Sequence, residues 1–303
     1  MPVRSQLARV LRRIGCVQAM AALAWLALWH AWAPVLAWSG FAALLLLGPI
    51  VLALEFVLLA IVARGDQEVP DASLGQLLRA WLGETRQLFQ VFYWRQPLRW
   101  RAVDDCLPAE GAGRTGVVFL HGFMCNRGFW APWMHRLRAS GVPHVAVNLE
   151  PVFGEIDRTG DIVERAVQQV TSLTGRPPVL VCHSMGGLAA RSWLRTHGAA
   201  SRVQHVVTIA SPHHGTWLGR FSRRPNGRQM RLESAWLRGL QQHEASHPRP
   251  PWTCWYTNCD NIVFPPSTAR LEGADNRFLP GLAHVDLAFA PPVMDQALGL
   301  LSR

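Results

Sequence analysis

The sequence predicts an α/β protein with a mainly parallel sheet, helices on both faces of the sheet and an apolar segment in front. Three observations lead to this fold class. From residue 116 onward, short apolar stretches alternate with stretches of helical period, and strands that alternate with helices form parallel sheets. One apolar stretch, residues 177–183, leads directly into Ser184 and the pair Gly186-Gly187. Two long apolar runs lie before residue 65.

The two apolar runs are each long enough to cross a bilayer. Residues 14–31 carry no charged side chain, and residues 41–62 are apolar apart from Glu55. A spanning helix needs about 20 such residues, and the intervening residues 32–40 contain proline, glycine and the tryptophans typical of a membrane interface. We therefore expect residues 1–65 to form a hairpin of two transmembrane helices, with Glu55 facing the first span or a water-filled crevice.

Arginines at the ends of the hairpin set its expected orientation. Four arginines precede the first run and Arg64 follows the second, whereas the turn carries no charge. Because basic residues remain on the cytoplasmic side, we expect a bacterial-type inner-membrane protein with two spans and its globular part in the cytoplasm. A signal peptide cleaved near residues 31–33 is the alternative, and a single span would place the globular part outside.

Residues 66–110 connect the anchor to the globular domain. Residues 66–72 are acidic and resemble a surface linker, and the apolar positions of residues 73–92 approximate helical spacing with arginines among them. Such an amphipathic helix lies on a membrane surface or packs on the globular domain, and the sequence leaves both readings open. Residues 95–101 are basic and aromatic, and we expect the first strand to begin there.

The globular domain is expected over residues 111–303. Its strands are predicted at residues 116–120, 142–148, 179–182, 203–210 and 253–257. Its helices are predicted at residues 129–140, 161–174, 188–194 and 292–301. The acidic residue that opens the 161–174 stretch suits the positive end of a helix dipole.

Ser184 stands where a strand is predicted to turn sharply into a helix. This arrangement, a nucleophile elbow, exposes the serine hydroxyl at the start of the helix. The turn is so tight that the residues two positions before and after the serine must be small. Gly186 meets the second requirement, and Cys182 stands where the motif usually has glycine. We therefore expect Ser184 to be a nucleophile.

A serine nucleophile needs a base and an acid that orients the base. In a parallel sheet, the loops at the carboxyl ends of the strands converge on one edge. His284, between the last strand-like segment and the closing helix, is the predicted base. Asp260, just after the 253–257 strand, is the predicted orienting acid, and Asp275 is its competitor.

The oxyanion of the reaction needs backbone N–H donors. Met185 directly follows the nucleophile, and Phe123 lies in the loop after the 116–120 strand, which are the two usual positions for such donors. The residues expected to support this site are His121, Gly122, His183 and Gly186.

These motifs together resemble the α/β-hydrolase superfamily, and within it bacterial triacylglycerol lipases and esterases. The resemblance covers about residues 115–303 and is carried by His-Gly-Phe at 121–123, His-Ser-Met-Gly-Gly at 183–187, Ser-Pro-His-His-Gly-Thr at 211–216, Asp260 and His284. It implies an α/β-hydrolase fold with a triad of Ser184, Asp260 and His284. It also implies hydrolysis of the carboxylic esters of lipids beneath a mobile lid at about residues 217–250.

Charge and composition limit the expected partners. The net charge is +10 and all 30 basic residues are arginine, which binds phosphate and carboxylate groups. Without a phosphate loop, an RNA-binding signature or zinc spacing, we expect lipid and a bilayer as partners, no nucleic acid, no cofactor and no obligate protein partner. The six scattered cysteines are expected to be free thiols.

One feature of the resemblance argues against a metal. Secreted lipases of this kind often bind calcium through an aspartate after the catalytic histidine and another from the lid side. Asp286 matches the first position, but residues 212–252 contain no aspartate. We therefore expect a membrane-anchored serine ester hydrolase without a metal. The alternatives are an acyltransferase with the same triad and a non-catalytic membrane protein that binds lipids or partners.

Overall fold

The computed structural model describes residues 5–198 and 200–302. Its globular part is built on a parallel six-stranded sheet in the order β2-β1-β3-β4-β5-β6. The strands are β1 (Val117–Leu120), β2 (His144–Ala146), β3 (Val179–His183), β4 (His205–Ile209), β5 (Trp252–Tyr256) and β6 (Asp275–Phe278). The parallel sheet agrees with the predicted fold class, and β1 to β5 lie at the five predicted stretches.

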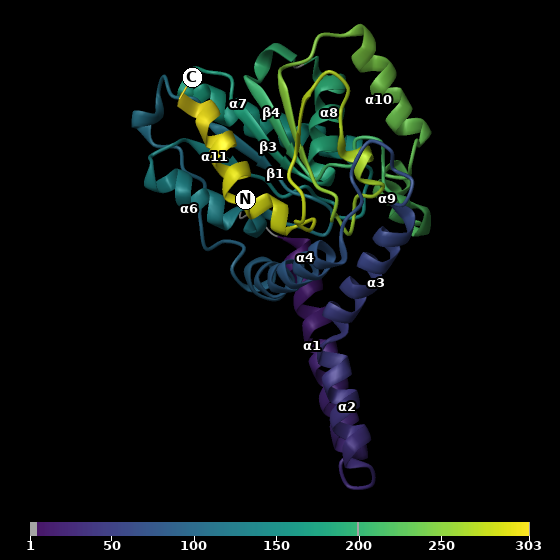
Figure 1. Cartoon of the computed structure of the whole chain (residues 1–303). Coiled ribbons are helices and arrows are strands. Elements are labelled where there is room, and N and C mark those ends of the chain that lie inside the picture. The colour runs from purple at the N-terminus through teal and green to yellow at the C-terminus, as the bar shows by residue number, and fades with distance from the viewer. Residues whose placement is uncertain (1–4, 199, 303) are drawn as a thin grey trace.

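Helices cover both faces of the sheet, and each face has its own core (Figure 1). The helices of the globular part are α6 (Ala131–Ala139), α7 (Gly160–Thr174), α8 (Met185–His197), α9 (Pro225–Gln229), α10 (Ala235–Ser246) and α11 (Pro291–Gly299). Phe119 packs with Trp133 of α6 and Val293 of α11. The next residue, Leu120, packs on the other face with α7, α8 and α10. This alternation follows from side chains of a strand pointing to opposite faces.

Two stretches differ from the prediction. The edge strand β6 was not predicted, because three of its four residues are polar (Asp275, Asn276 and Arg277) and an edge strand needs no apolar pattern. Residues 95–101 are not a strand. They begin at the last residue of a π-helical segment, η1 (Leu88–Arg95), and include the short helix α5 (Gln96–Leu98). Pro97 explains this, since proline begins a helix readily and is excluded from central strands.

The first apolar run forms one long helix and the second is bent. Helix α1 (Gln6–Trp29) is long and apolar enough to cross a membrane, whereas α2 (Pro34–Leu45) and α3 (Leu47–Val62) meet at a bend of 65°. The expected hairpin of two transmembrane helices is therefore not confirmed: α1 is one candidate span, and α2 with α3 is a second only if the bent pair counts as one span. Pro49 is tolerated because it lies in the first turn of α3, where its missing N–H has no intrahelical partner.

Helices α1 and α2 lie side by side in a stalk that projects from the globular part (Figure 1). Ala22 and Ala37 are buried between them, and the indole N–H of Trp25 donates to the carbonyl of Leu36 at 3.1 Å. Most other apolar side chains of the stalk are exposed, as Trp32 at 86% and Val35 at 82% illustrate. The stalk thus presents an apolar surface in nearly every direction.

Helix α3 leaves the stalk and packs on the globular part. Phe56 and Leu59 are buried there with Phe264 and Ala283. The Glu55 carboxylate accepts a hydrogen bond from the side-chain amide of Asn261 at 2.7 Å. The expectation that Glu55 faces the first span or a water-filled crevice is therefore wrong, because this residue faces the globular domain.

The segment after α3 is also bound to the globular part. Asp66 accepts a hydrogen bond from the Ser267 backbone at 2.8 Å, and Val69 is buried in a small apolar cluster. Helix α4 (Leu74–Gln87) begins at Ser73, whose hydroxyl and the side chain of Gln76 form a capping box.

Helix α4 has two different faces. Ala80, Glu84 and Gln87 are buried, whereas Leu74, Leu78 and Leu82 are exposed. The structure therefore shows the packed helix that the sequence allowed. It also leaves an apolar stripe on the opposite side, which is the side that an interfacial helix would present to lipid.

Candidate active site

Ser184 joins β3 to α8 in a strained turn. Its φ of 53° and ψ of −126° lie in a region that non-glycine residues rarely adopt. Its neighbours are crowded: a Cβ on Gly186 would lie 2.2 Å from the Leu120 carbonyl oxygen, and one on Gly122 would lie 2.8 Å from the Ser184 Cβ. Cys182 is fully buried in the sheet core and is accommodated in place of the usual glycine. The backbone thus has the form of a nucleophile elbow.

His284 and Asp260 lie in contact at the carboxyl edge of the sheet. The Nδ1 atom of His284 is 2.9 Å from Oδ1 and 3.0 Å from Oδ2 of Asp260. Asp260 also accepts backbone hydrogen bonds from Ile262 at 2.9 Å and Val263 at 2.7 Å, which fix its carboxylate. With Nδ1–H donating to Asp260, the Nε2 atom of His284 is the one left to accept a proton. Asp275 lies instead at the start of β6 and pairs with Arg277.

Each of the three predicted triad residues is buried. Ser184, His284 and Asp260 are 6%, 5% and 2% exposed. Burial by itself disfavours the charged form of His284, but the negative charge and the hydrogen bond of Asp260 outweigh burial and raise the pKa of this imidazole. A histidine next to a fixed carboxylate is the arrangement that a serine base requires.

The predicted oxyanion donors lie next to the elbow. The Met185 amide is the first of helix α8, where no intrahelical acceptor exists. Phe123 follows Gly122 in the loop after β1, which abuts Ser184. His121 holds this loop: its Nδ1 donates to the Gly122 carbonyl at 2.9 Å and its Nε2 accepts from the Leu149 amide at 3.0 Å. Burial lowers the pKa of His121 to about 4, so this ring is neutral.

His183 is the remaining supporting residue. Its ring stacks on Phe129 with centroids 4.5 Å apart, and its Nε2 donates to the His284 carbonyl at 3.1 Å. It therefore ties the elbow to the loop that carries His284.

The sequence matches the alpha/beta hydrolase family over residues 117–299, which is more than half of the chain. The chain belongs to this family. No curated protein matches the sequence.

Three solved structures illustrate the fold of this hydrolase. The mature lipase BlEst2 of Bacillus licheniformis is similar with a TM-score of 0.54 at 17% identity, over 61% of this chain and 92% of that lipase. Lipase B of Aspergillus fumigatus has a TM-score of 0.57 at 16% identity, over 68% of this chain and 57% of that one. Phospholipase PlaB of Legionella pneumophila has a TM-score of 0.50 at 14% identity, over 63% and 60%. At these identities the likeness shows the fold.

Two hydrogen-bond partners of the loop that carries His284, Glu84 and Asn261, were missed by sequence reasoning. Glu84 of α4 accepts hydrogen bonds from the backbone N–H groups of Val285 at 3.0 Å and Asp286 at 3.2 Å. On the other side, Asn261 accepts from the His284 N–H at 3.3 Å and donates to Glu55. The histidine loop of the hydrolase is therefore held by helices that precede its globular domain.

Glu84 is separated from Val285 by 201 residues and Glu55 from Asn261 by 206, so spacing could not reveal these two partners. Asn261 lies 23 positions before His284. The one local sign of this role in the sequence is that Glu84 is a polar residue on the buried face of the amphipathic helix α4. Burial raises the pKa of Glu84 to about 8, against the lowering effect of His284 and the two backbone N–H groups. Asp286 accepts from the Gln87 side chain at 3.0 Å and from Arg86 at 3.3 Å.

The segment predicted as a lid is fastened to the hydrolase core over its second half. Arg191 of α8 forms a two-pronged ion pair with Glu244 of α10, at 2.7 and 2.9 Å. Asp157 accepts from the indole of Trp236 at 2.7 Å. The first half begins with a short helix, η6 (Trp217–Phe221), whose Trp217 stacks on Phe264 beside α3.

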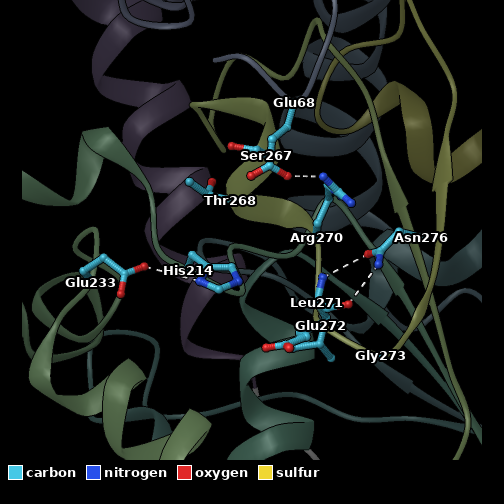
Figure 2. A pocket seen from close by; sticks show the side chains of 10 residues that line it. All are labelled: Glu68, His214, Glu233, Ser267, Thr268, Arg270, Leu271, Glu272, Gly273 and Asn276. Atoms are coloured by element: carbon cyan, nitrogen blue, oxygen red, sulfur yellow. Dashed lines mark hydrogen bonds and ion pairs between the residues drawn. The ribbon is translucent and has the colours of Figure 1, made fainter. Parts of the chain in front are cut away.

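A polar pocket of about 510 Å³ lies beside the loops that follow β4 and β5 (Figure 2). Glu68 pairs there with Arg270, and Glu233 pairs with His214 at 3.3 Å. Ser184, Asp260 and His284 do not line this pocket. Among the residues that the structure describes, no group of three His, Cys, Asp or Glu side chains is placed to hold a metal ion.

The raised pKa of His284 predicts the acid side of the pH–rate profile. Only the neutral imidazole accepts a proton, so kcat/KM of ester cleavage should fall as the pH drops through the pKa of His284. Because Asp260 raises this pKa above the usual value of about 6.5, half of the maximal rate should be reached above pH 6.5. Measuring kcat/KM for a soluble short-chain ester as a function of pH gives this midpoint. A midpoint below pH 6.5 would contradict the predicted role of Asp260.

Proposed function

We propose that this α/β hydrolase is a membrane-anchored serine hydrolase that cleaves the carboxylic esters of lipids. The observation that carries the proposal is the buried contact between His284 and Asp260 at the edge of the sheet where Ser184 occupies a strained elbow. A purely binding protein has no need of a nucleophile, a base, an orienting acid and two backbone donors together. The lipases among the similar structures agree with an ester substrate.

The proposed reaction proceeds in two halves. Ser184 Oγ attacks the acyl carbon while its proton passes to Nε2 of His284, and Asp260 stabilises the resulting imidazolium. The negative charge on the former carbonyl oxygen is bound by the N–H groups of Phe123 and Met185. His284 then protonates the leaving alcohol, and an acyl-enzyme remains on Ser184. Water, deprotonated by the same histidine, releases the fatty acid and regenerates the serine.

A lipid-class assay tests this function. The full-length protein in detergent is incubated with monoacylglycerol, diacylglycerol, triacylglycerol and phospholipid, with and without an added alcohol. Hydrolysis predicts free fatty acid in amounts that the alcohol barely changes. An acyltransferase instead moves most of the acyl group to the alcohol. If no lipid ester is consumed, the proposed substrate class is wrong.

The proposed anchor is the apolar hairpin of residues 1–65, of which α1 and α2 form the stalk. Its exposed apolar surface would be costly in water and is expected to lie in lipid. We expect both ends of the chain in the cytoplasm, because basic residues flank the stalk only at its base.

Two measurements check the anchor. Alkaline carbonate should leave the protein in the membrane pellet, and reporter fusions at residue 66 and at the C-terminus should report the cytoplasm. Active periplasmic reporters at both points would overturn the orientation, and release by carbonate would overturn the anchor itself.

A further inference from the structure

Two adjoining cavities lie where α1 leaves the globular part, away from the candidate triad. The first, of about 400 Å³, is lined by Ser5, Arg9, Arg12, Trp100 and Arg101. The second, of about 440 Å³, shares Arg12 and continues along α1. Its lining is otherwise mainly apolar and includes Leu11, Ile14, Gly15, Leu88, Phe92 and Leu98. A basic cavity therefore adjoins an apolar groove.

We propose that these cavities together bind one anionic phospholipid, with its phosphate among Arg9, Arg12 and Arg101 and an acyl chain in the adjoining groove. The inference rests on the proposed membrane anchoring, and it assigns the stalk a specific lipid partner distinct from the substrate.

The basic cavity matches the chemistry of a phosphate group. Of the lining residues that the structure describes, three are arginines and none is acidic. Arg9 and Arg12 are three positions apart and so share one face of α1, at the end of the helix where its dipole is positive. The guanidinium of Arg101 lies 4.3 Å from the centroid of the Trp100 ring, which holds it flat. Planar guanidinium groups bind phosphate oxygens in pairs.

The neighbouring acid does not occupy this cavity. Glu150, whose charge interacts with Arg9, accepts a hydrogen bond from the Gln6 backbone at 2.7 Å and is not part of the lining.

The order of the two cavities matches the depth profile of a membrane. Residues 14–31 of the stalk carry no charge, so Ile14 marks the start of the hydrocarbon level. Arg9 precedes Ile14 by five residues, or about 7.5 Å of helix rise, which places the arginines at the headgroup level. The groove begins at that boundary. Free phosphate would use the arginines alone, whereas a phospholipid uses both cavities, and we therefore favour the lipid.

Gly15 gives a direct way to fill the groove. Gly15 lines the groove and a Cβ there would meet no atom within 4 Å, so we use Gly15→Leu to add a side chain at this position. Gly75 of α4 is equally unobstructed and lies outside both cavities, so Gly75→Leu is a matched control. For the arginines, the matched control is Arg13→Gln, on the same helix but outside both linings.

The test measures lipid binding by the full-length Ser184→Ala protein, which does not consume lipid. Retention of phosphatidylglycerol and phosphatidylcholine in detergent is compared by native mass spectrometry, with inorganic phosphate as a competitor. We expect a preference for phosphatidylglycerol that falls about ten-fold for each of Arg9→Gln, Arg12→Gln and Arg101→Gln, as for loss of a charge-assisted hydrogen bond. Gly15→Leu should lose retention, and both control variants should keep it.

Several results would overturn the proposal. These are equal retention of the two lipids, an equal loss in Arg13→Gln, or displacement by inorganic phosphate. The same arginine substitutions are also made in the protein that retains Ser184. Hydrolysis of a soluble ester by these variants shows that they are folded. Carbonate extraction separates the two hypotheses: a protein that stays in the membrane without lipid preference contradicts only this inference, and an extracted protein contradicts the anchor.

Discussion

Replacing Ser184 with alanine should lower kcat for ester hydrolysis by on the order of 10⁴-fold or more, with little change in KM. The hydroxyl is the nucleophile of the acylation step in the proposed mechanism, and its removal leaves the oxyanion donors and substrate contacts in place. Alanine fits the elbow sterically, so the variant should fold like the parent. Steady-state kinetics with a p-nitrophenyl ester and a thermal unfolding curve measure the two quantities.

The matched control for this prediction is Ser192→Ala. Ser192 lies on the same helix and donates its hydroxyl to Asp157, away from the elbow. We expect this variant to keep kcat near that of the parent. If Ser184→Ala cleaves the ester at the parental rate, the assignment of the nucleophile is wrong.

Replacing Glu84 with alanine should lower kcat by about 10²-fold, which is the typical effect of displacing a catalytic group by about 1 Å. The Glu84 carboxyl group is the acceptor for the backbone N–H groups of Val285 and Asp286, next to His284. Without it these groups lose their partner and the loop is free to shift. Because Glu84 is a positioning residue that acts through His284, KM for a short ester should change little.

A second variant separates positioning from charge. Glu84→Gln keeps one acceptor oxygen and should retain more of the rate than Glu84→Ala. It cannot ionise, so any change in the rate that the parent shows near pH 8, where Glu84 loses its proton, should be absent. Arg79→Gln, on an exposed part of the same helix, is the control. Equal kcat in the parent and in Glu84→Ala would show that α4 does not position His284.

The ionisation of Glu84 also predicts a change in stability with pH. Its pKa is raised in the folded protein from 4.5 to about 8, so folding favours the protonated form. The contribution of Glu84 to stability is full below pH 4.5 and is lost as the pH rises through 8. Compared with Glu84→Gln, the parent should therefore lose thermal stability between pH 5 and 9. A constant difference in Tm over this range would contradict the burial of an ionisable Glu84.

The parts of the site that sequence predicted are those fixed by local geometry. A tight strand-to-helix turn requires small residues beside Ser184, and Gly186 has no room for a Cβ. The loops after β5 and β6 must meet at the carboxyl edge of the sheet, and the structure brings Asp260 and His284 together there. In the same way, β1 to β5 were predictable because most of their residues are apolar.

The parts that sequence missed depend on long-range contacts. The break between α2 and α3 has an apolar sequence on both sides, so hydropathy shows one continuous run there. Placing the Glu55 carboxylate in lipid would cost free energy. In the structure it instead accepts a hydrogen bond from Asn261, more than 200 residues later. Strand β6 is the edge strand and pairs with β5 through its backbone. Its polar residues lack the periodicity of a buried strand.

Covalent labelling with a fluorophosphonate probe tests the central claim most directly. The probe reacts with a serine only when a base activates its hydroxyl and the oxyanion donors stabilise the adduct. We predict one adduct on the full-length protein, located at Ser184 by peptide mass spectrometry. It should be absent in Ser184→Ala and form far more slowly in His284→Ala. A folded protein that takes up no probe, or takes it up at another residue, would contradict the account.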